Sequence, residues 1–359
     1  MSKSIVCTVT NDISQDARMH RICGTLAKNG FQVTLIGRLK PTSIPLEKSN
    51  FNTERLTVAS ERGVLFYLNY NLKLFFYLIK SDADVICSVD ADTLLAGRLA
   101  TWFSNKELVY DAHELFTELP ELDNKPVRKL VWKIINRVGL WGSVRCYTVN
   151  DELATMLSKK YKHSFISIQN VPDLNQDKRS TLTPTKPIKL VYVGMINKGR
   201  GIEESIKFVK NHKNYELHII GNGDLYDSLK HSTIGQSRIY WYGFLSQNNI
   251  KQLLPTFDIG LNLLSANSKN YFYSSANKFF DYVQATVPVL TMNFPVYSRL
   301  CSEYKVGELI QSLQESDIED GIMQILKDYE NYGIQCRKAR QIWNWQNEEK
   351  KLLSFYSVI

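Results

Sequence analysis

The stretch that decides the fold is SSANKFFDYVQATVPVL, residues 274–290, which follows the strand-length apolar run IGLNLL at residues 259–264. It predicts a polar turn, a short amphipathic helix and a buried strand opened by Pro288. Asn277 and Asp281 are four residues apart and share one face of that helix, whereas the aromatic residues between them point to the core. Ligands bind open α/β sheets at the carboxyl ends of the strands. The segment therefore indicates an α/β fold with a ligand site here, and a capped surface helix with an ordinary aspartate is the alternative.

Strands and helices alternate along the rest of the chain, which is typical of doubly wound parallel sheets. The 359 residues, 44% of them hydrophobic, suffice for two separate cores. A polar, proline-containing stretch interrupts the alternation, and the pattern then restarts. We expect an N-terminal domain at 1–172, a linker at 173–187, a C-terminal domain at 188–330 and a helical tail at 331–359.

Residues 274–290 resemble the signature of bacterial family 4 glycosyltransferases. The matching residues are Ser274, Asn277, Lys278, Gln284, Ala285 and Pro288. Asp281 stands where the family has glutamate, Thr286 replaces the usual glycine, and the resemblance extends from Thr8 to about Val306. It implies a GT-B fold, in which two Rossmann-like doubly wound domains face each other across a cleft and the last helix returns to the first domain. It also implies sugar transfer from a nucleotide-activated donor, with retention of configuration, to a glycan or lipid-linked acceptor.

The expected donor site lies in the C-terminal domain. Gly194 ends a strand, and Lys198, Gly199, Arg200 and Gly201 precede a helix that starts near Ile202. Cations beside a helix amino terminus suit a diphosphate, although basic residues are common in such loops. By resemblance, Arg200 or Lys198 is the counterion of the leaving group. The same resemblance assigns the donor to further loop and helix residues: Gly221, Gly223, Tyr242, Gly243, Ser274, Asn277, Lys278 and Asp281, with Asp281 on the ribose.

The expected catalytic residue of the N-terminal domain is His113, which follows the predicted strand ELVYDA. The resemblance implies that His113 looks across the cleft, positions the sugar hydroxyls and stabilises the developing oxocarbenium. A structural histidine is the alternative. Glu114 and the loop residues Asn11, Asp12, Asp16 and Arg18 are candidates for acceptor binding. Helix capping by Asp12 or Ser14, with Asp16 in the first turn, explains that loop equally well.

A basic, acid-free run occupies residues 124–150 of this chain, whose net charge is +8. Its cations alternate with apolar residues that include Trp132 and Trp141, as in helices that lie on anionic membranes. A solvated helix beside a substrate channel is the alternative. The aromatic segment 63–80 is too polar to span a bilayer and predicts a packed helix. We expect no nucleic-acid partner.

Neither a metal nor a cofactor is expected. The pairs Asp82–Asp84 and Asp90–Asp92 flank one strand, where capping explains them. The six cysteines form no CxxC pair and indicate reduced thiols, and the chain start has no signal-peptide pattern, so we expect a cytoplasmic protein.

Tyr273 stands where the family often has a first glutamate, so sugar contacts are expected from Ser274 and Ser275. This departure keeps a catalytically silent homologue open, and a sugar-nucleotide epimerase of the same fold is a further alternative.

Overall fold

The computed structural model describes residues 3–118, 122, 125–176, 184–267 and 269–359. Residue 124 of the basic run and residues 177–183 of the expected linker lie outside the described residues. The chain forms two compact units, Met1–Gln169 with Glu348–Ile359, and Asn170–Asn347. We call them unit 1 and unit 2.

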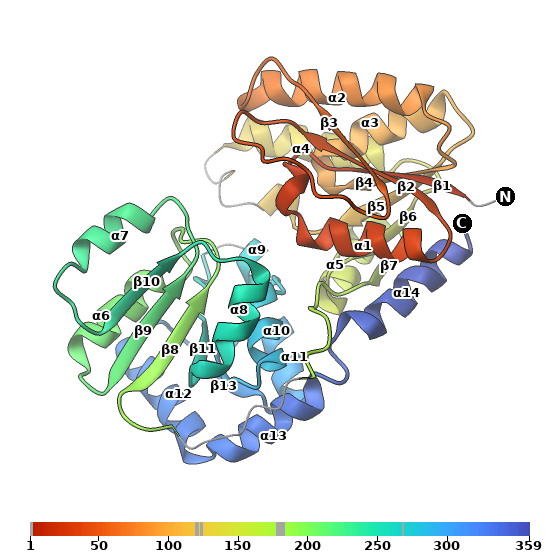
Figure 1. Cartoon of the computed structure of the whole chain (residues 1–359). Coiled ribbons are helices and arrows are strands. Elements are labelled where there is room, and N and C mark those ends of the chain that lie inside the picture. Colours follow the sequence, from red (N-terminus) through yellow and green to blue (C-terminus); the bar gives the residue numbers. More distant parts are fainter. Residues whose placement is uncertain (1–2, 119–121, 123–124, 177–183, 268) are drawn as a thin grey trace. The chain divides into compact units, whose positions relative to one another are not determined.

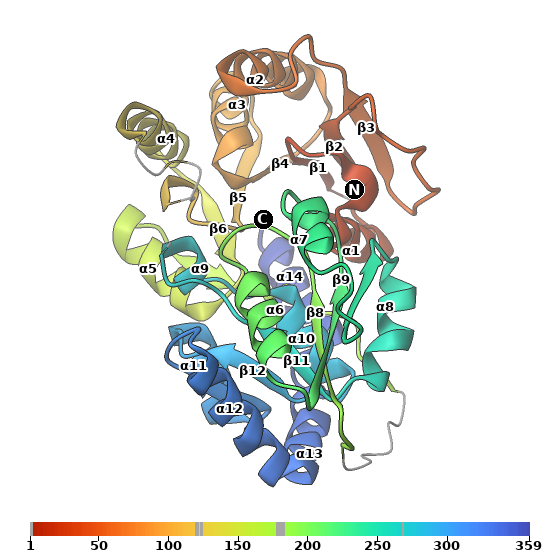
Figure 2. The same ribbon diagram turned by 90° about the vertical axis from the view of Figure 1, so that its left-hand side faces the viewer.

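Unit 1 is built on a parallel sheet of seven strands in the order β3-β2-β1-β4-β5-β6-β7. The strands are β1 Ser4–Thr8, β2 Gln32–Arg38, β3 Asn52–Leu56, β4 Val85–Val89, β5 Glu107–Ala112, β6 Arg145–Thr148 and β7 Phe165–Ser167. Its helices are α1 Ala17–Lys28, α2 Gly63–Lys80, α3 Asp90–Trp102, α4 Pro126–Gly139 and α5 Asp151–Tyr161. Figures 1 and 2 place α2 and α3 on the face of the sheet opposite α1. The strand order reverses between β1 and β4, which is where doubly wound sheets bind ligands.

Unit 2 repeats this plan with six parallel strands in the order β10-β9-β8-β11-β12-β13. The strands are β8 Ile188–Val193, β9 Tyr215–Ile220, β10 Ile239–Gly243, β11 Ile259–Asn262, β12 Val289–Met292 and β13 Gly307–Ile310. The helices are α6 Ile202–Asn211, α7 Tyr226–Ser232, α8 Gln247–Leu253, α9 Lys269–Phe272, α10 Asn277–Gln284, α11 Pro295–Glu303, α12 Glu315–Lys327 and α13 Tyr329–Ala339. The expected fold class, two Rossmann-like doubly wound sheets, is therefore confirmed.

The last helix, α14 (Trp345–Ser357), contributes its residues from Glu348 onward to unit 1. There the Glu348 carboxylate accepts a hydrogen bond from the Gln169 amide at 2.9 Å, and Phe355 packs edge-on against Tyr147 with ring centroids 5.2 Å apart. The carboxyl terminus of the chain thus completes the packing of the amino-terminal sheet.

Three local predictions can be compared with the structure. Helix α2 covers the expected range 63–80, and no helix in the described residues is long and apolar enough to cross a membrane. All six cysteines are free thiols, and all but Cys301 are buried. The first helix begins at Ala17, because Asp16 accepts the Met19 amide as its N-cap and Asp12 caps a preceding 3-10 turn. Asp16 is therefore a cap and not a first-turn residue.

Candidate functional site

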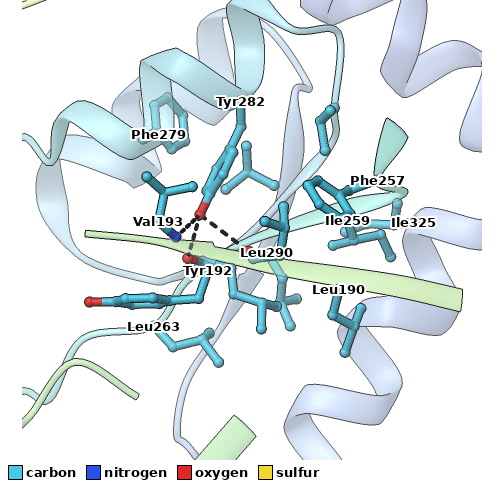
Figure 3. Close-up of a cluster of buried hydrophobic side chains, with 14 of the residues drawn as sticks. Leu190, Tyr192, Val193, Phe257, Ile259, Leu263, Phe279, Tyr282, Leu290 and Ile325 are labelled. Carbon is cyan, nitrogen blue, oxygen red and sulfur yellow. Dashed lines mark hydrogen bonds between the residues drawn. The ribbon is translucent and has the colours of Figure 1, made fainter. Parts of the chain in front are cut away.

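The signature helix α10 is held in unit 2 by the buried Tyr282. Its hydroxyl accepts the Val193 amide at 3.0 Å and lies 3.2 Å from the Val191 carbonyl oxygen and 3.4 Å from that of Leu261 (Figure 3). The ring packs directly on Gly260, where an added Cβ would lie 2.3 Å from a ring carbon. Glycine in β11 thus lets the helix approach the sheet closely. This contact fixes where Asn277, Lys278 and Asp281 stand at the carboxyl edge.

Glycines shape the neighbouring strand ends. Gly194 and Gly221 have φ of 136° and 137°, conformations that favour glycine, and a Cβ on Gly221 would lie 1.9 Å from the Gly194 carbonyl oxygen. The Gly221 amide donates to the Gly243 carbonyl at 2.8 Å, so the ends of β9 and β10 are bonded together. A Cβ on Gly223 would lie within 2.6 Å of Ile196 backbone atoms. The four predicted glycines therefore lie in one tightly packed set of loops.

Two cations of this edge lack hydrogen-bond partners for buried nitrogens in the described part of the chain. They are Lys278 through Nζ and Arg200 through Nε. Burial, and then the charge of Arg200, holds the pKa of Lys278 well below its ordinary value. Aromatic rings flank both groups: Lys278 Nζ lies 3.7 Å from the Tyr192 centroid, and Arg200 Cζ 5.0 Å from that of Tyr271. Buried polar groups normally find a partner, so this arrangement suits an anion that is absent from the chain itself.

The approach to helix α6 extends the cationic site. Gly201, with φ of 72°, is the N-cap residue of α6 and packs against Leu263, where a Cβ would lie 2.4 Å from the Leu263 Cβ. The amide groups of the first helical turn and the helix dipole favour anions at this end. Lys198, three residues earlier, is exposed. Arg200, half-buried with its Nε enclosed, therefore belongs to the inner part of the site, and Lys198 to its surface.

The remaining predicted donor residues are less closely gathered. Asn277 is exposed and accepts a hydrogen bond from Asn170 at 2.9 Å, Asp281 is half-buried, and the Ser274 hydroxyl donates to the Tyr271 carbonyl at 2.8 Å. The Tyr242 hydroxyl lies 3.0 Å from His218 Nδ1, and its ring packs against the rings of His218 and Phe257, so these two residues hold the Tyr242 side chain in place.

In unit 1, His113 lies at the centre of a buried polar network. Its Nε2 is 2.8 Å from Arg18 Nε and 2.9 Å from Asp111 Oδ2, while Arg18 Nη2 lies 3.1 Å from Asp111 Oδ1. Burial opposes the charges of both Asp111 and His113, yet their ion pairs prevail. The pKa of Asp111 lies below its ordinary value because of Arg18 and His113, and the pKa of His113 lies above its ordinary value because of Asp111 and Asp90.

Asp90 is a residue of this network that the sequence analysis assigned to capping. It follows β4 with φ of 57°, and its Oδ1 accepts the amides of His113 at 2.8 Å and Glu114 at 3.3 Å. Burial raises the pKa of Asp90 to about 7 and that of Asp92 to about 6. Perturbed carboxyl groups at a strand end indicate function. The available signal was the position of Asp90 directly after a mostly apolar strand, at the predicted ligand edge.

The proposed acceptor residues separate in the structure. Arg18 is only 5% exposed, and its guanidinium is bonded to His113, Asp111 and the Ile168 carbonyl. Asn11 donates to Asp16 at 2.9 Å, and Asp12 lies 3.4 Å from Arg55. Glu114 is exposed. The structure brings Arg18 to His113, whereas Asn11 and Asp16 contact each other and Asp12 pairs with Arg55 of β3.

The described residues contain no group of three or more histidine, cysteine or acidic side chains that could hold a metal ion. The chemistry of the edge in unit 2 is instead cationic, with an arginine, a lysine and a helix amino terminus. Such a set neutralises a leaving diphosphate. Two Rossmann-like units, one with this cationic edge, are typical of GT-B enzymes that act on nucleotide-activated sugars.

Family models agree with that assignment. The model for family 4 glycosyltransferases matches residues 16–170, and the model for group 1 glycosyl transferases matches residues 173–342. The chain belongs to the family 4 glycosyltransferases, which confirms the resemblance of residues 274–290, and it is an enzyme of that class. No curated protein matches the sequence.

Solved structures share the GT-B fold at low identity. Sucrose-phosphate synthase from Thermosynechococcus elongatus superposes with a TM-score of 0.81 at 14% identity, over 99% of this chain and 98% of the other. Alr3699/HepE from Anabaena, in complex with UDP and glucose, superposes with a TM-score of 0.75 at 13% identity, over 99% of this chain and 100% of the other. WaaG, a glycosyltransferase involved in lipopolysaccharide biosynthesis, superposes with a TM-score of 0.69 at 15% identity, over 98% of this chain and 99% of the other. At these identities the likeness shows the fold alone.

Proposed function

We propose that this glycosyltransferase transfers a sugar from a nucleotide-activated donor to a glycan or lipid-linked acceptor, with retention of configuration. The observation that carries the donor assignment is the pair of buried, unbonded nitrogens on Lys278 and Arg200 beside the amino end of α6. A diphosphate supplies the missing acceptors for both. The UDP complex of the similar HepE structure supports the same ligand class.

In this proposal the chain itself stabilises the leaving group. Arg200, Lys278 and the first turn of α6 neutralise the charge that develops on the diphosphate as the glycosidic bond breaks. Lys198 adds an exposed cation at the rim. Asp281 binds the ribose, and Ser274, Asn277 and the loops at Gly221 and Gly243 complete the donor site. His113 positions sugar hydroxyls and stabilises the oxocarbenium.

The acceptor assignment is supported by an apolar, basic face of unit 1. On α2 the residues Val64, Leu65, Leu68, Leu72 and Phe76 are 53 to 71% exposed, and on α4 four more apolar side chains are about half exposed or more. Neither helix contains an acidic residue, and Tyr67 packs edge-on against Trp132 with centroids 5.2 Å apart, which joins the two helices. Contiguous exposed apolar surface with cations suits an anionic bilayer. We therefore propose that α2 and α4 hold the enzyme at the membrane that carries its acceptor.

Binding calorimetry with UDP, GDP and ADP, followed by turnover assays with the corresponding sugar nucleotides, tests the donor assignment. One nucleoside diphosphate should bind, and its sugar nucleotides should be hydrolysed or transferred. The Arg200→Ala variant should lose most of that affinity, whereas a control variant at the exposed Ile234 should not. If none of the three diphosphates binds to the wild-type chain, the proposed donor site is wrong.

A further inference from the structure

The two ring nitrogens of His113 have different surroundings. Nε2 faces inward, 2.8 Å from Arg18 Nε and 2.9 Å from Asp111 Oδ2. Nδ1 faces Asp90, whose Oδ2 is 3.9 Å away. Both side chains are 20% exposed, so each is reached by solvent.

Arg18 and Asp111 make opposite demands on His113 Nε2. A guanidinium only donates hydrogen bonds and calls for a lone pair on Nε2, whereas a carboxylate only accepts and calls for an N–H there. When the lone pair faces Arg18, the neutral imidazole carries its hydrogen on Nδ1. In the imidazolium form, which Asp111 stabilises, Nδ1 is protonated as well. His113 therefore presents an N–H donor toward Asp90 in the imidazolium form and in the neutral form that accepts from Arg18.

Asp90 is held with one oxygen turned to this donor. Its Oδ1 accepts the His113 and Glu114 amides, and its φ of 57° is a conformation that aspartate adopts only at a cost. In the described part of the chain, Oδ2 has no hydrogen bond, since 3.9 Å exceeds hydrogen-bonding distance. If a substrate oxygen lies within hydrogen-bonding distance of both Oδ2 and Nδ1, the angle between the two contacts at that oxygen is roughly 90°. A hydroxyl tolerates this angle when it accepts a hydrogen bond from one group and donates one to the other.

We propose that Asp90 Oδ2 and His113 Nδ1 together bind one substrate hydroxyl, which donates to the carboxylate and accepts from the imidazole. Asp90 is then a substrate-contacting residue, and Arg18 and Asp111 are positioning residues that set the tautomer of His113. This inference rests on the proposed function. The hydroxyl belongs either to the sugar of the donor or to the acceptor, and the chemistry of recognition is the same.

The ionised form of Asp90 is the one that accepts the hydroxyl proton. Asp90 faces His113 and Glu114 after β5 and Asp92 on its own helix, while Arg18 and Asp111 face the far side of His113. Because burial raises the pKa of Asp90 to about 7, the rate of sugar-nucleotide hydrolysis should rise with pH through that value.

The test compares the wild-type chain with Asp90→Asn and, as a matched control, Asp92→Asn. Asparagine tolerates the left-handed backbone and keeps an oxygen for the two amides. We expect Asp90→Asn to reduce kcat/KM for sugar-nucleotide hydrolysis about 10- to 100-fold, the loss of a charge-assisted hydrogen bond, and to abolish the rise near pH 7. Its affinity for the nucleoside diphosphate should stay unchanged. Asp92, whose carboxylate is bonded to Thr10, keeps the Asp90 carboxylate in place when it is changed to asparagine, so the rise with pH should persist. It should move to lower pH, because the charge of Asp92 contributes to the raised pKa of Asp90.

The two sources of the hydroxyl give different results. A hydroxyl of the donor sugar predicts weaker binding of the sugar nucleotide to Asp90→Asn, whereas an acceptor hydroxyl, replaced by water in hydrolysis, predicts a lower kcat alone. A wild-type pH profile and kcat/KM in Asp90→Asn would overturn the proposal. If the wild-type chain binds a nucleoside diphosphate but turns over no sugar nucleotide, the proposed function fails. Nitrogen-15 NMR of His113 then decides: protonation of the neutral ring at Nε2 overturns the arrangement, and protonation at Nδ1 supports it.

Discussion

The side-chain nitrogen of Lys278 lies 3.7 Å from the centroid of the Tyr192 ring and has no hydrogen-bond partner in the described residues. An aromatic face attracts a cation but supplies no acceptor to replace water. Burial, together with the nearby charge of Arg200, consequently lowers the pKa of Lys278 well below its ordinary value. In the free protein, Lys278 Nζ is therefore a hydrogen-bond donor without an acceptor. A bound anion can supply that acceptor and favour the protonated form of Lys278.

The first prediction concerns proton uptake at Lys278. A diphosphate favours the ammonium form, so its binding should take up a proton, and its affinity should fall as the pH rises above the depressed pKa of the free protein. Calorimetry of nucleoside diphosphate binding in buffers of different ionisation enthalpy measures this uptake. Lys278→Met should remove it and weaken binding by about 1.5 to 3 kcal/mol, while raising the melting temperature. Equal proton uptake by the wild-type chain and Lys278→Met would contradict the assignment.

The second prediction separates Arg200 from Lys198. Arg200→Ala should weaken diphosphate binding by about 1.5 to 3 kcal/mol because it removes a partly buried, charge-assisted contact. Lys198 is exposed, so Lys198→Ala should cost about 0.5 kcal/mol and less at high salt. Titration calorimetry at two salt concentrations measures both losses. If neither variant changes the affinity, the cationic loop does not bind the diphosphate.

The third prediction concerns backbone strain at Thr286, which has φ of 60° where the family usually has glycine. A β-branched residue is unfavourable in this conformation. Thr286→Gly should raise the free energy of unfolding by about 1 kcal/mol, measured by urea denaturation. Thr286→Ala retains a Cβ and should gain less. A destabilised glycine variant would mean that the Thr286 contact with Arg340, at 3.4 Å, outweighs the strain.

The fourth prediction concerns the α2 and α4 face. Binding to anionic vesicles should fall with added salt and with charge reversal at Lys133 and Arg137, since each basic residue contributes about 1 kcal/mol near the surface. Lys129 is less informative because it pairs with Glu118 at 2.8 Å. Leu65→Ser with Leu68→Ser should also reduce binding, whereas Ile234→Ser, an exposed apolar residue of unit 2, should not. Equal cosedimentation with neutral and anionic vesicles, or with neither, would assign this face to another role.

The fifth prediction is a pH dependence of stability. Unfolded aspartate titrates near pH 4, whereas the pKa of Asp90 in the folded chain is about 7. Between these values the folded state holds a proton that the unfolded state has released, so the unfolding free energy should fall as pH rises, by on the order of 2 to 4 kcal/mol. His113 acts in the same direction: its raised pKa gives stability that is complete below about pH 6.5 and is lost as the pH rises through the folded value.

Melting temperatures from pH 5 to 8 measure this effect. Asp90→Asn should flatten the profile and be more stable than the wild-type chain at pH 8. Subtraction of the variant profile from the wild-type profile isolates the contribution of Asp90. Other groups act in the opposite direction, such as His218, because burial lowers its pKa. A wild-type profile in the variant would show that Asp90 titrates normally in the folded chain.

Much of the fold follows from local patterns. Apolar strand runs and glycine punctuation predicted most strands of both sheets, since buried parallel strands are continuous apolar segments. Strand β3 (NTERL), at the edge of its sheet, carries two charged residues and no apolar run, and strand β13 (GELI) has only two apolar residues at its end, so local patterns do not indicate these two strands. The signature at residues 274–290 also identified the family and the helix that carries Lys278.

The two doubly wound sheets, the family and the basic loop at Arg200 follow from the amino-acid sequence alone, because they depend on periodicity and on residues close together in the chain. The surroundings of His113 follow only from the folded chain. Arg18 and Asp111 are 93 positions apart, and Asp90 resembles a helix cap until the His113 amide is found on its carboxylate. The pKa values of Asp90 and Lys278 depend on burial, which is a property of the assembled surroundings and not of the local sequence.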